Sequence, residues 1–184
     1  MKTNPAIDLY RKMYVEPQFE RTALFALLQQ HYACSSVLYP GCSIHIAPSF
    51  VFPHVVYVDR SPETIQFFAE TAAIQEYIDR HKIYKRSAYF RFIAQDYVQP
   101  LPLDGQLFDL LLSLFAGVIT HTCKPYLKPG GILVTNNSQG DARQAADDPD
   151  FQLMAVVRYQ KKDYALIIEN LEMILAAANN AKTK

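Results

Sequence analysis

The segment SSVLYPGCSIHIAPSFVFPHVVYVD, residues 35–59, decides the fold class. It contains an apolar run at 37–39, a Pro-Gly turn at 40–41, a second apolar run at 55–58, and a terminal carboxylate, Asp59. This order of strand, glycine turn, strand and acidic residue is typical of the start of an adenosine-cofactor site in an open α/β sheet. The turn is glycine-poor, because Gly41 stands alone where such sites usually carry two or three glycines.

Length and composition point to one ordinary globular domain. The chain has 184 residues, 50% of them hydrophobic, which is enough for a sizeable core. Eighteen basic residues balance eighteen acidic ones, so no net field recruits nucleic acid or anionic lipid. We therefore expect no nucleic-acid partner and no membrane partner.

The termini and the cysteines indicate a cytoplasmic protein. Residues 1–8 lack the apolar core of a signal peptide, and no apolar run approaches the length of a membrane span. The three cysteines, Cys34, Cys42 and Cys123, are odd in number and have no metal-type spacing, so we expect reduced thiols and no metal site.

Apolar runs alternate with helix-like stretches along most of the chain, which is typical of βαβ units. Strands are predicted at residues 37–39, 55–58, 88–94, 108–114 and 132–135. Helices are predicted at 17–32, at 62–80 behind a Ser61 cap, and at 117–127 with its last turn disturbed by Pro125, and a turn or two fits between Pro48 and Pro53. Two β-rich runs at 151–157 and 164–168 predict a closing hairpin.

We expect residues 1–184 to form a single domain. Its parts are a helical amino-terminal segment, 1–33, an α/β core, 34–169, and a tail, 170–184, predicted as a frayed helix.

Five parallel-type strands closed by a β-hairpin resemble the class I S-adenosylmethionine-dependent methyltransferase fold, over about residues 20–170. The segment YLKPGGILV, residues 126–134, resembles the turn before that family's fifth strand. The resemblance implies a Rossmann-like three-layer sandwich with a mostly parallel, seven-stranded sheet that ends in an antiparallel hairpin. It also implies S-adenosylmethionine as cofactor.

By this resemblance, the loop after the first strand passes the methionine part of the cofactor, Asp59 meets the ribose hydroxyls, and Asp96 and Tyr97 meet the adenine. The competing structural roles are a plain turn for Gly41 and a turn cap for Asp96. Asp59 has no evident structural duty, because Ser61 already caps the next helix. The residues assigned to the cofactor are Tyr39, Pro40, Gly41, Cys42, Ser43, Asp59, Arg60, Asp96, Tyr97, Ser113 and Leu114.

The sequence contains no recognisable arrangement of residues for nucleophilic or metal-assisted catalysis, and the catalytic residues are unknown. His45 lies nearest the glycine turn and is the candidate general base, with a structural role as the alternative. The Asp/Asn-Pro-Pro motif of the family's base and glutamine methylases is absent after the fourth strand, which favours a small-molecule acceptor. The polar segment 136–141 either binds substrate or is a plain loop.

Two further segments leave alternatives open. The aromatic and basic residues from Tyr10 to Phe19 suit a lid, a docking helix or a dimer contact, so a homo-oligomer is one option. The basic residues between Arg80 and Arg86 suit a phosphate contact or a solvated helix end.

The sequence thus favours a methyltransferase for an unidentified small acceptor. The alternative is a methyltransferase-like binding or interaction protein without catalysis. A nicotinamide-binding oxidoreductase ranks third, because Ile44, His45 and Ile46 are bulky where a pyrophosphate needs bare backbone amides.

Overall fold

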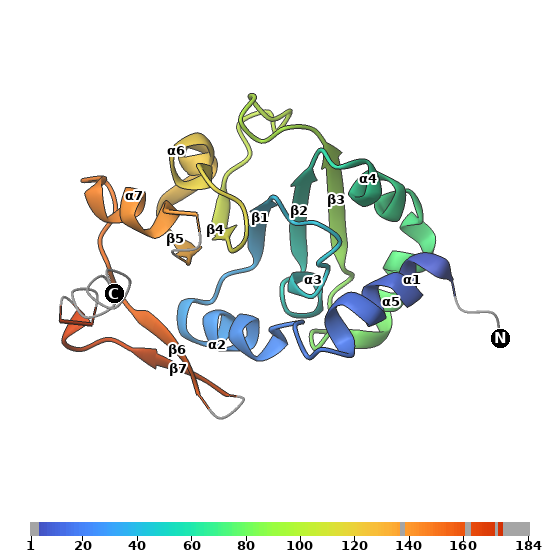
Figure 1. The fold of residues 1–184 in the computed structure, drawn as a ribbon, viewed down its shortest axis with the longest axis horizontal. Coiled ribbons are helices and arrows are strands. Elements are labelled where there is room, and N and C mark those ends of the chain that lie inside the picture. The colour runs from blue at the N-terminus through green and yellow to red at the C-terminus, as the bar shows by residue number, and fades with distance from the viewer. Residues whose placement is uncertain (1–3, 137–138, 161–162, 172, 175–184) are drawn as a thin grey trace. The chain divides into compact units, whose positions relative to one another are not determined.

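The computed structural model describes residues 4–136, 139–160, 163–171 and 173–174. Two compact units, residues 1–145 and 146–184, divide the chain, and each is described by itself. The first holds a five-stranded parallel sheet with the strand order β3-β2-β1-β4-β5 (Figure 1). Its strands are β1 (Ser36–Pro40), β2 (His54–Asp59), β3 (Tyr89–Ala94), β4 (Phe108–Ser113) and β5 (Leu127–Thr135).

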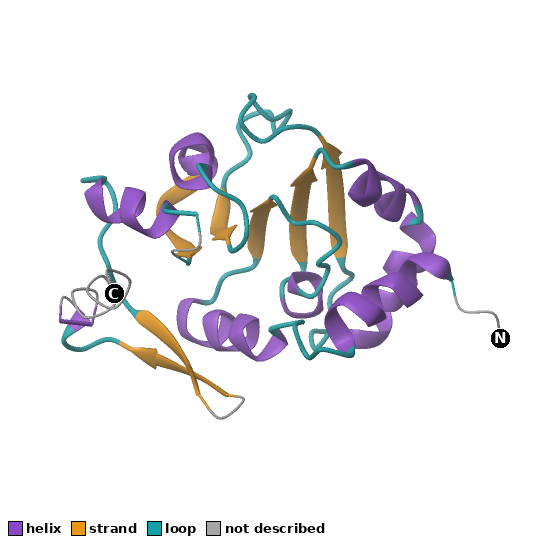
Figure 2. Ribbon diagram, in the orientation of Figure 1, coloured by secondary structure: helices purple, strands orange, loops and turns teal. Residues whose placement is uncertain are grey.

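The second unit contains the predicted hairpin as a separate sheet. Strands β6 (Val156–Gln160) and β7 (Asp163–Ile167) pair antiparallel with each other (Figure 2). The α/β class and the parallel sheet are confirmed, whereas the single seven-stranded sheet is wrong: the strands divide five and two. A hairpin pattern specifies the pairing of its own two strands, and it carries no information about a third strand at either edge.

Helices flank the parallel sheet and connect most of its strands (Figure 2). The amino-terminal segment forms α1 (Pro5–Tyr10), which continues into a π-helical turn, η1 (Arg11–Val15). The remaining helices are α2 (Thr22–Tyr32), α3 (Pro48–Val51), α4 (Pro62–Ala69), α5 (Thr71–His81), α6 (Ile119–Cys123), the 3₁₀ turn η2 (Lys124–Tyr126) and α7 (Asp141–Asp147). Over the described residues, no helix is long and apolar enough to cross a bilayer.

Several elements differ from the sequence predictions. The helix expected over 17–32 begins only at Thr22, and the hairpin strand expected over 151–157 lies at Val156–Gln160. The helix expected over 62–80 is two helices, α4 and α5, that meet at Glu70, where the backbone leaves the helical region with ψ 44°. The helix expected over 117–127 is only α6 followed by η2, because Pro125 lies in its second half. Strand β5 begins at Leu127, and its pairing with β4 shifts at a bulge before Ile132.

The tail helix expected over 170–184 lies largely outside the described residues.

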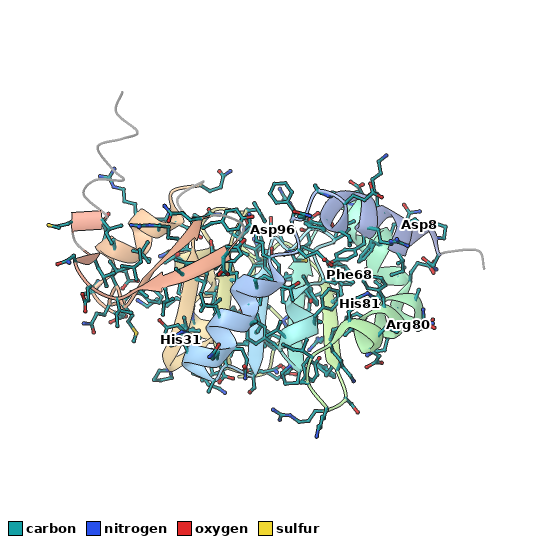
Figure 3. All side chains as sticks on the ribbon, turned by 90° about the horizontal axis from the view of Figure 1, so that it is seen from below. Asp8, His31, Phe68, Arg80, His81 and Asp96 are labelled. Atoms are coloured by element: carbon teal, nitrogen blue, oxygen red, sulfur yellow. The ribbon has the colours of Figure 1, made fainter. Side chains whose placement is uncertain are left out.

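The core lies on both faces of the parallel sheet. Leu38, Val56 and Leu111 share one face, where they form a cluster with α6. Aromatic rings fill the other face, as the contacts of Phe25 with Phe52 and of Tyr39 with Tyr57 show. At the edge strand β3, Phe68 of α4, which is labelled in Figure 3, stacks on Phe92. The ring centroids lie 4.3 Å apart. The sheet is therefore covered on both sides, as its continuous apolar strands predict.

Candidate functional site

The carboxyl edge of the parallel sheet brings the predicted site residues together. Gly41 follows β1, Asp59 ends β2, Asp96 and Tyr97 follow β3, and Ser113 ends β4. Because all five strands run parallel, these ends lie at one edge, where ligands bind in open α/β sheets.

Gly41 makes the tight turn that the sequence suggests. Its φ is +61°, and its amide donates to the Val58 carbonyl oxygen at 2.8 Å. A Cβ at this position would lie 2.3 Å from the Cβ of Ala116 and 3.6 Å from Cε1 of Tyr97. Only glycine fits, therefore, and the loop after β4 packs directly on it.

Asp59 has a structural duty that the sequence analysis did not find. Its Oδ2 accepts a hydrogen bond from the Ser43 amide at 2.9 Å, and its Oδ1 accepts one from the Ser61 amide at 2.8 Å. The Ser61 hydroxyl caps α4 as predicted, accepting from the Thr64 amide at 3.3 Å. The expectation that capping by Ser61 leaves Asp59 without a structural role is therefore wrong. A carboxylate offers about four acceptor positions, so a diol can still be bound there.

Asp96 is likewise engaged within the chain. Its Oδ2 accepts from the Arg60 guanidinium at 2.8 Å, and its Oδ1 accepts from the Val98 amide at 3.1 Å, which is the turn cap considered from sequence (Figure 3). Next to it, the Tyr97 hydroxyl donates to the Gly117 carbonyl oxygen at 3.0 Å. Burial raises the pKa of Tyr97, and the charge of Asp96 raises it further.

Two further carboxylates act electrostatically on Tyr97. The charges of Asp141, at the start of α7, and of Asp59, at the end of β2, also raise its pKa. Of the three carboxylates, Asp96 is paired with Arg60, and Asp141 is buried.

His45 lies in the core. Its side chain is fully buried, and its Nε2 lies 2.9 Å from the Glu20 carbonyl oxygen. Because a carbonyl oxygen only accepts, Nε2 carries the proton, and Nδ1 accepts from the Tyr39 hydroxyl at 3.1 Å. Burial lowers the pKa of His45 to about 3. The ring thus stays neutral and has both nitrogens occupied.

Cys42 is also inside, and burial raises the pKa of its thiol well above the ordinary value. Cys34 and Cys123 are buried as well, and all three thiols are free. Among the described residues, no group of three or more His, Cys, Asp or Glu side chains is placed to hold a metal ion.

The amino-terminal segment lies against the loops of the site. Tyr14 stacks on His45 with ring centroids 4.6 Å apart, and the Arg21 guanidinium lies 4.3 Å from the centre of the Phe115 ring. The Tyr10 hydroxyl donates to Glu20 Oε1 at 2.8 Å. These contacts pack the amino-terminal segment on its own chain, and they do not distinguish a lid from a docking helix.

Asp141 is the functional candidate that sequence reasoning missed. It is 1% exposed, and its Oδ2 accepts from the Ile119 and Thr120 amides at 3.1 and 3.2 Å and from the Ser113 hydroxyl. Its Oδ1 is buried, and no described residue is its hydrogen-bond partner. The sequence signal was a polar segment after β5, but nothing local distinguished this aspartate from an ordinary loop residue.

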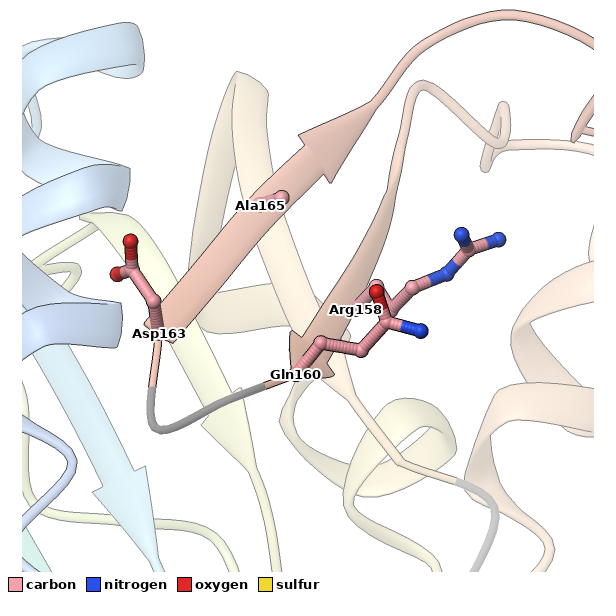
Figure 4. Close-up of a pocket in the computed structure, with 4 residues that line it drawn as sticks. All are labelled: Arg158, Gln160, Asp163 and Ala165. Carbon is pink, nitrogen blue, oxygen red and sulfur yellow. The ribbon is translucent and has the colours of Figure 1, made fainter.

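Two other features belong elsewhere in the chain. At the end of α5, Arg80 pairs with Glu76 and Lys82 with Asp79, the latter at 2.7 Å, which is consistent with a solvated helix end. In the second unit, a surface pocket on one face of the hairpin is lined by Arg158, Gln160, Asp163 and Ala165 (Figure 4).

No protein-family model matches this sequence, and no curated protein matches it. Among solved structures, a candidate O-methyltransferase from Klebsiella pneumoniae is similar with a TM-score of 0.53 at 13% identity, over 90% of this chain and 89% of that one. The N-methyltransferase NodS from Bradyrhizobium japonicum WM9 is similar with a TM-score of 0.47 at 18% identity, over 81% of this chain and 92% of that one. A candidate caffeoyl-CoA O-methyltransferase from Staphylococcus aureus is similar with a TM-score of 0.48 at 16% identity, over 73% of this chain and 67% of that one.

The first of these similarities, with the strand order of the sheet, shows that the chain has the class I methyltransferase fold. The fold is shared by proteins of different activities, so the activity has to be argued from the site.

Proposed function

We propose that this protein binds S-adenosylmethionine at the carboxyl edge of its parallel sheet and transfers the methyl group to a small-molecule acceptor. The observation that carries the proposal is the placement of Asp59. Its carboxylate ends β2 and is hydrogen-bonded to the loop that follows the Gly41 turn. An acceptor group at this point suits a ribose diol.

The residues at this edge fit the cofactor in two respects. Gly41, with φ +61°, makes the tight turn by which the loop after β1 reaches this edge. The Asp59 carboxylate, at the end of β2, carries the sign of charge that attracts a sulfonium cation. When bound, S-adenosylmethionine supplies an activated methyl group.

The chain itself would contribute alignment and exclusion of water. Methyl transfer is a displacement at carbon, for which positioning supplies a large part of the rate enhancement. His45 is not placed to take a proton from the acceptor, because its ring is buried and both its nitrogens are engaged. The protein would therefore act on an acceptor that is already nucleophilic, or use another base.

A second candidate function is that of a binding protein without catalysis. Ala116 packs on Gly41, and Asp96 is paired with Arg60, so the groups that would meet a cofactor already have partners in the chain. A protein that had lost the cofactor could retain such internal contacts.

Calorimetric titration with S-adenosylhomocysteine distinguishes the two functions. We expect measurable binding to the wild type and at least tenfold weaker binding to Asp59→Asn, because a hydrogen bond to a charged group contributes about 1.5–3 kcal/mol. The matched control is Asp104→Asn, an exposed residue in the loop that leads to the start of β4. It should bind like the wild type.

The stability of Asp59→Asn must be measured alongside, because Asp59 also holds the Ser43 and Ser61 amides. Absence of binding to the folded wild type at millimolar ligand would count against the cofactor and favour the non-catalytic function. Equal affinity of Asp59→Asn and the wild type would show that the ligand does not use this carboxylate.

A further inference from the structure

The loop after β4, residues 114–118, packs on the Gly41 turn. We call it the β4 loop. Its Ala116 methyl group would clash with any Cβ at Gly41, at a separation of 2.3 Å. On the side where a Cβ would stand, the Gly41 backbone is thus in direct contact with this loop, and no ligand atom fits between the two there.

Hydrogen bonds from three other segments hold the β4 loop in this position. The Tyr97 hydroxyl, from the loop after β3, donates to the Gly117 carbonyl oxygen at 3.0 Å. The Asn136 side chain, after β5, donates to the Leu114 carbonyl oxygen. Asp141 accepts from the Ile119 and Thr120 amides at the end of the loop.

The same loop carries backbone strain. Val118 has φ +60° and ψ 12°, the left-handed region, which a β-branched residue rarely adopts. Its side chain is 47% exposed, so little apolar burial offsets the cost. In addition, the buried Asp141 Oδ1 has no hydrogen-bond partner among the residues that the structure describes. The closed arrangement is therefore held by hydrogen bonds against a local cost, which is typical of segments that change conformation at ligand sites.

We propose that the β4 loop is a built-in cover that closes the cofactor site in the free protein and moves off Gly41 when the cofactor binds. This inference rests on the proposed function. The cover and the ligand compete for the same space, so the apparent affinity depends on the fraction of molecules in which the cover is open. Substitutions that shift this fraction should change affinity in a direction set by the closed structure.

Two substitutions shift the cover in opposite directions. Tyr97→Phe removes the hydrogen bond to Gly117 and keeps the ring, so it weakens the closed state. We expect S-adenosylhomocysteine to bind about fivefold more tightly, the factor that one ordinary hydrogen bond contributes. Val118→Asn places a residue that tolerates positive φ in the closed loop and so favours closure. We expect about three- to tenfold weaker binding.

Ala33→Asn is the matched control for the second substitution. Ala33 also has a positive φ, +51°, but it ends α2 ahead of β1, at the opposite edge of the sheet. Both asparagine variants should resist urea better than the wild type, and only Val118→Asn should bind more weakly. Hydrogen exchange of the Ile119 and Thr120 amides, which donate to Asp141, supplies a second readout. The exchange of these amides should accelerate when S-adenosylhomocysteine is added.

The results separate the cover from the proposed function. Opposite shifts of affinity in the two variants would support both. Wild-type binding with unchanged affinity in both variants and unchanged exchange would overturn the cover and leave the function standing. Weaker binding by Tyr97→Phe would also overturn the cover, because it would make Tyr97 a contributor to ligand affinity. Absence of binding to all the variants would overturn both.

Discussion

Single polar residues stabilise the fold by hydrogen-bonding separate segments of the chain to one another. His45 joins the Glu20 backbone to Tyr39 of β1, and Asp59 joins the loop after β1 to the start of α4. At the opposite edge of the sheet, Asp109 binds the Ser35 and Ser36 amides at the start of β1. Each of these side chains connects segments far apart in the sequence, and each should contribute measurably to stability.

His45 should make stability depend on pH. Burial lowers its pKa in the folded protein to about 3, whereas the ordinary value is 6.5, so below pH 6.5 the unfolded chain binds a proton that the folded chain does not. Stability is fully present above pH 6.5 and should fall by up to about 1.4 kcal/mol per pH unit as the pH drops toward 3. Urea unfolding between pH 7 and pH 4.5 measures this slope.

The variant His45→Gln should be less stable at pH 7 and show a shallower slope over that range. His31→Gln, which changes an exposed ring in the last turn of α2, is the matched control. An unchanged slope in His45→Gln would contradict the assignment of the buried, neutral ring.

We expect Asp109 to contribute more to stability than His45. Both amide bonds to its Oδ2 measure 2.9 Å, and Lys128 Nζ lies 2.6 Å from its Oδ1. Burial alone would raise the pKa of Asp109, but the Lys128 ammonium and the two amides outweigh it and lower the pKa. The stability this carboxylate supplies is therefore present above about pH 4 and is lost at lower pH.

Asp109→Ala should lower the free energy of unfolding at pH 7 by about 2 kcal/mol, because it leaves two amides of β1 without an acceptor. Lys128→Met removes only the ion pair and should cost less than about 1 kcal/mol. Chemical denaturation of both variants checks the ranking. A larger loss of stability in Lys128→Met than in Asp109→Ala would show that the ion pair, and not the amide hydrogen bonds, supplies most of the stabilisation.

Helices and strands lie where the sequence predicts them when the local pattern of capping residues or apolar runs is strong. Ser61 with Pro62 predicted the start of α4 at the right residue, and the apolar runs predicted all five strands of the parallel sheet. The break at Glu70 was not predicted; there the Asn4 side chain, from the distant amino terminus, donates to the Glu70 carboxylate, and the Thr71 hydroxyl donates to the Phe68 carbonyl oxygen. Likewise, the early start of β5 depends on its pairing with β4.

The cap of α4 permits a prediction at this scale. Ser61→Ala should cost about 1 kcal/mol and lower the melting temperature by roughly 2–4 °C, because the Thr64 amide loses its acceptor. Ser61→Asp keeps an acceptor at the cap and should stay close to the wild type. If both variants lost the same stability, the cap would not be the cause.

At the scale of the whole molecule, the buried side chains are gathered in one of the two compact units. All the buried side chains of the described residues lie at or before Asp141, within the first unit. The described part of the second unit has none, although its Tyr159 and Tyr164 rings pair across the hairpin with centroids 4.8 Å apart.

A chain that ends at residue 145 should therefore fold cooperatively, because it retains the whole buried core. We expect circular dichroism to show a single thermal transition. We also expect S-adenosylhomocysteine affinity within about threefold of the wild type's, the difference that about 0.6 kcal/mol makes. The loss of the transition would show that residues 146–184 are needed for the fold. A folded but non-binding chain would place part of the site in the second unit.

By itself, the sequence determined the α/β class, the strands of the sheet and the acidic residues at their carboxyl ends, because strand patterns and turn residues act over a few neighbouring positions. Only the tertiary structure decided that Ala116 closes on Gly41, that His45 is buried and neutral, and that Asp141 accepts from α6. These features depend on contacts between segments that are distant in the chain. The same holds for the sheet, whose five strands and separate hairpin are set by which edges meet.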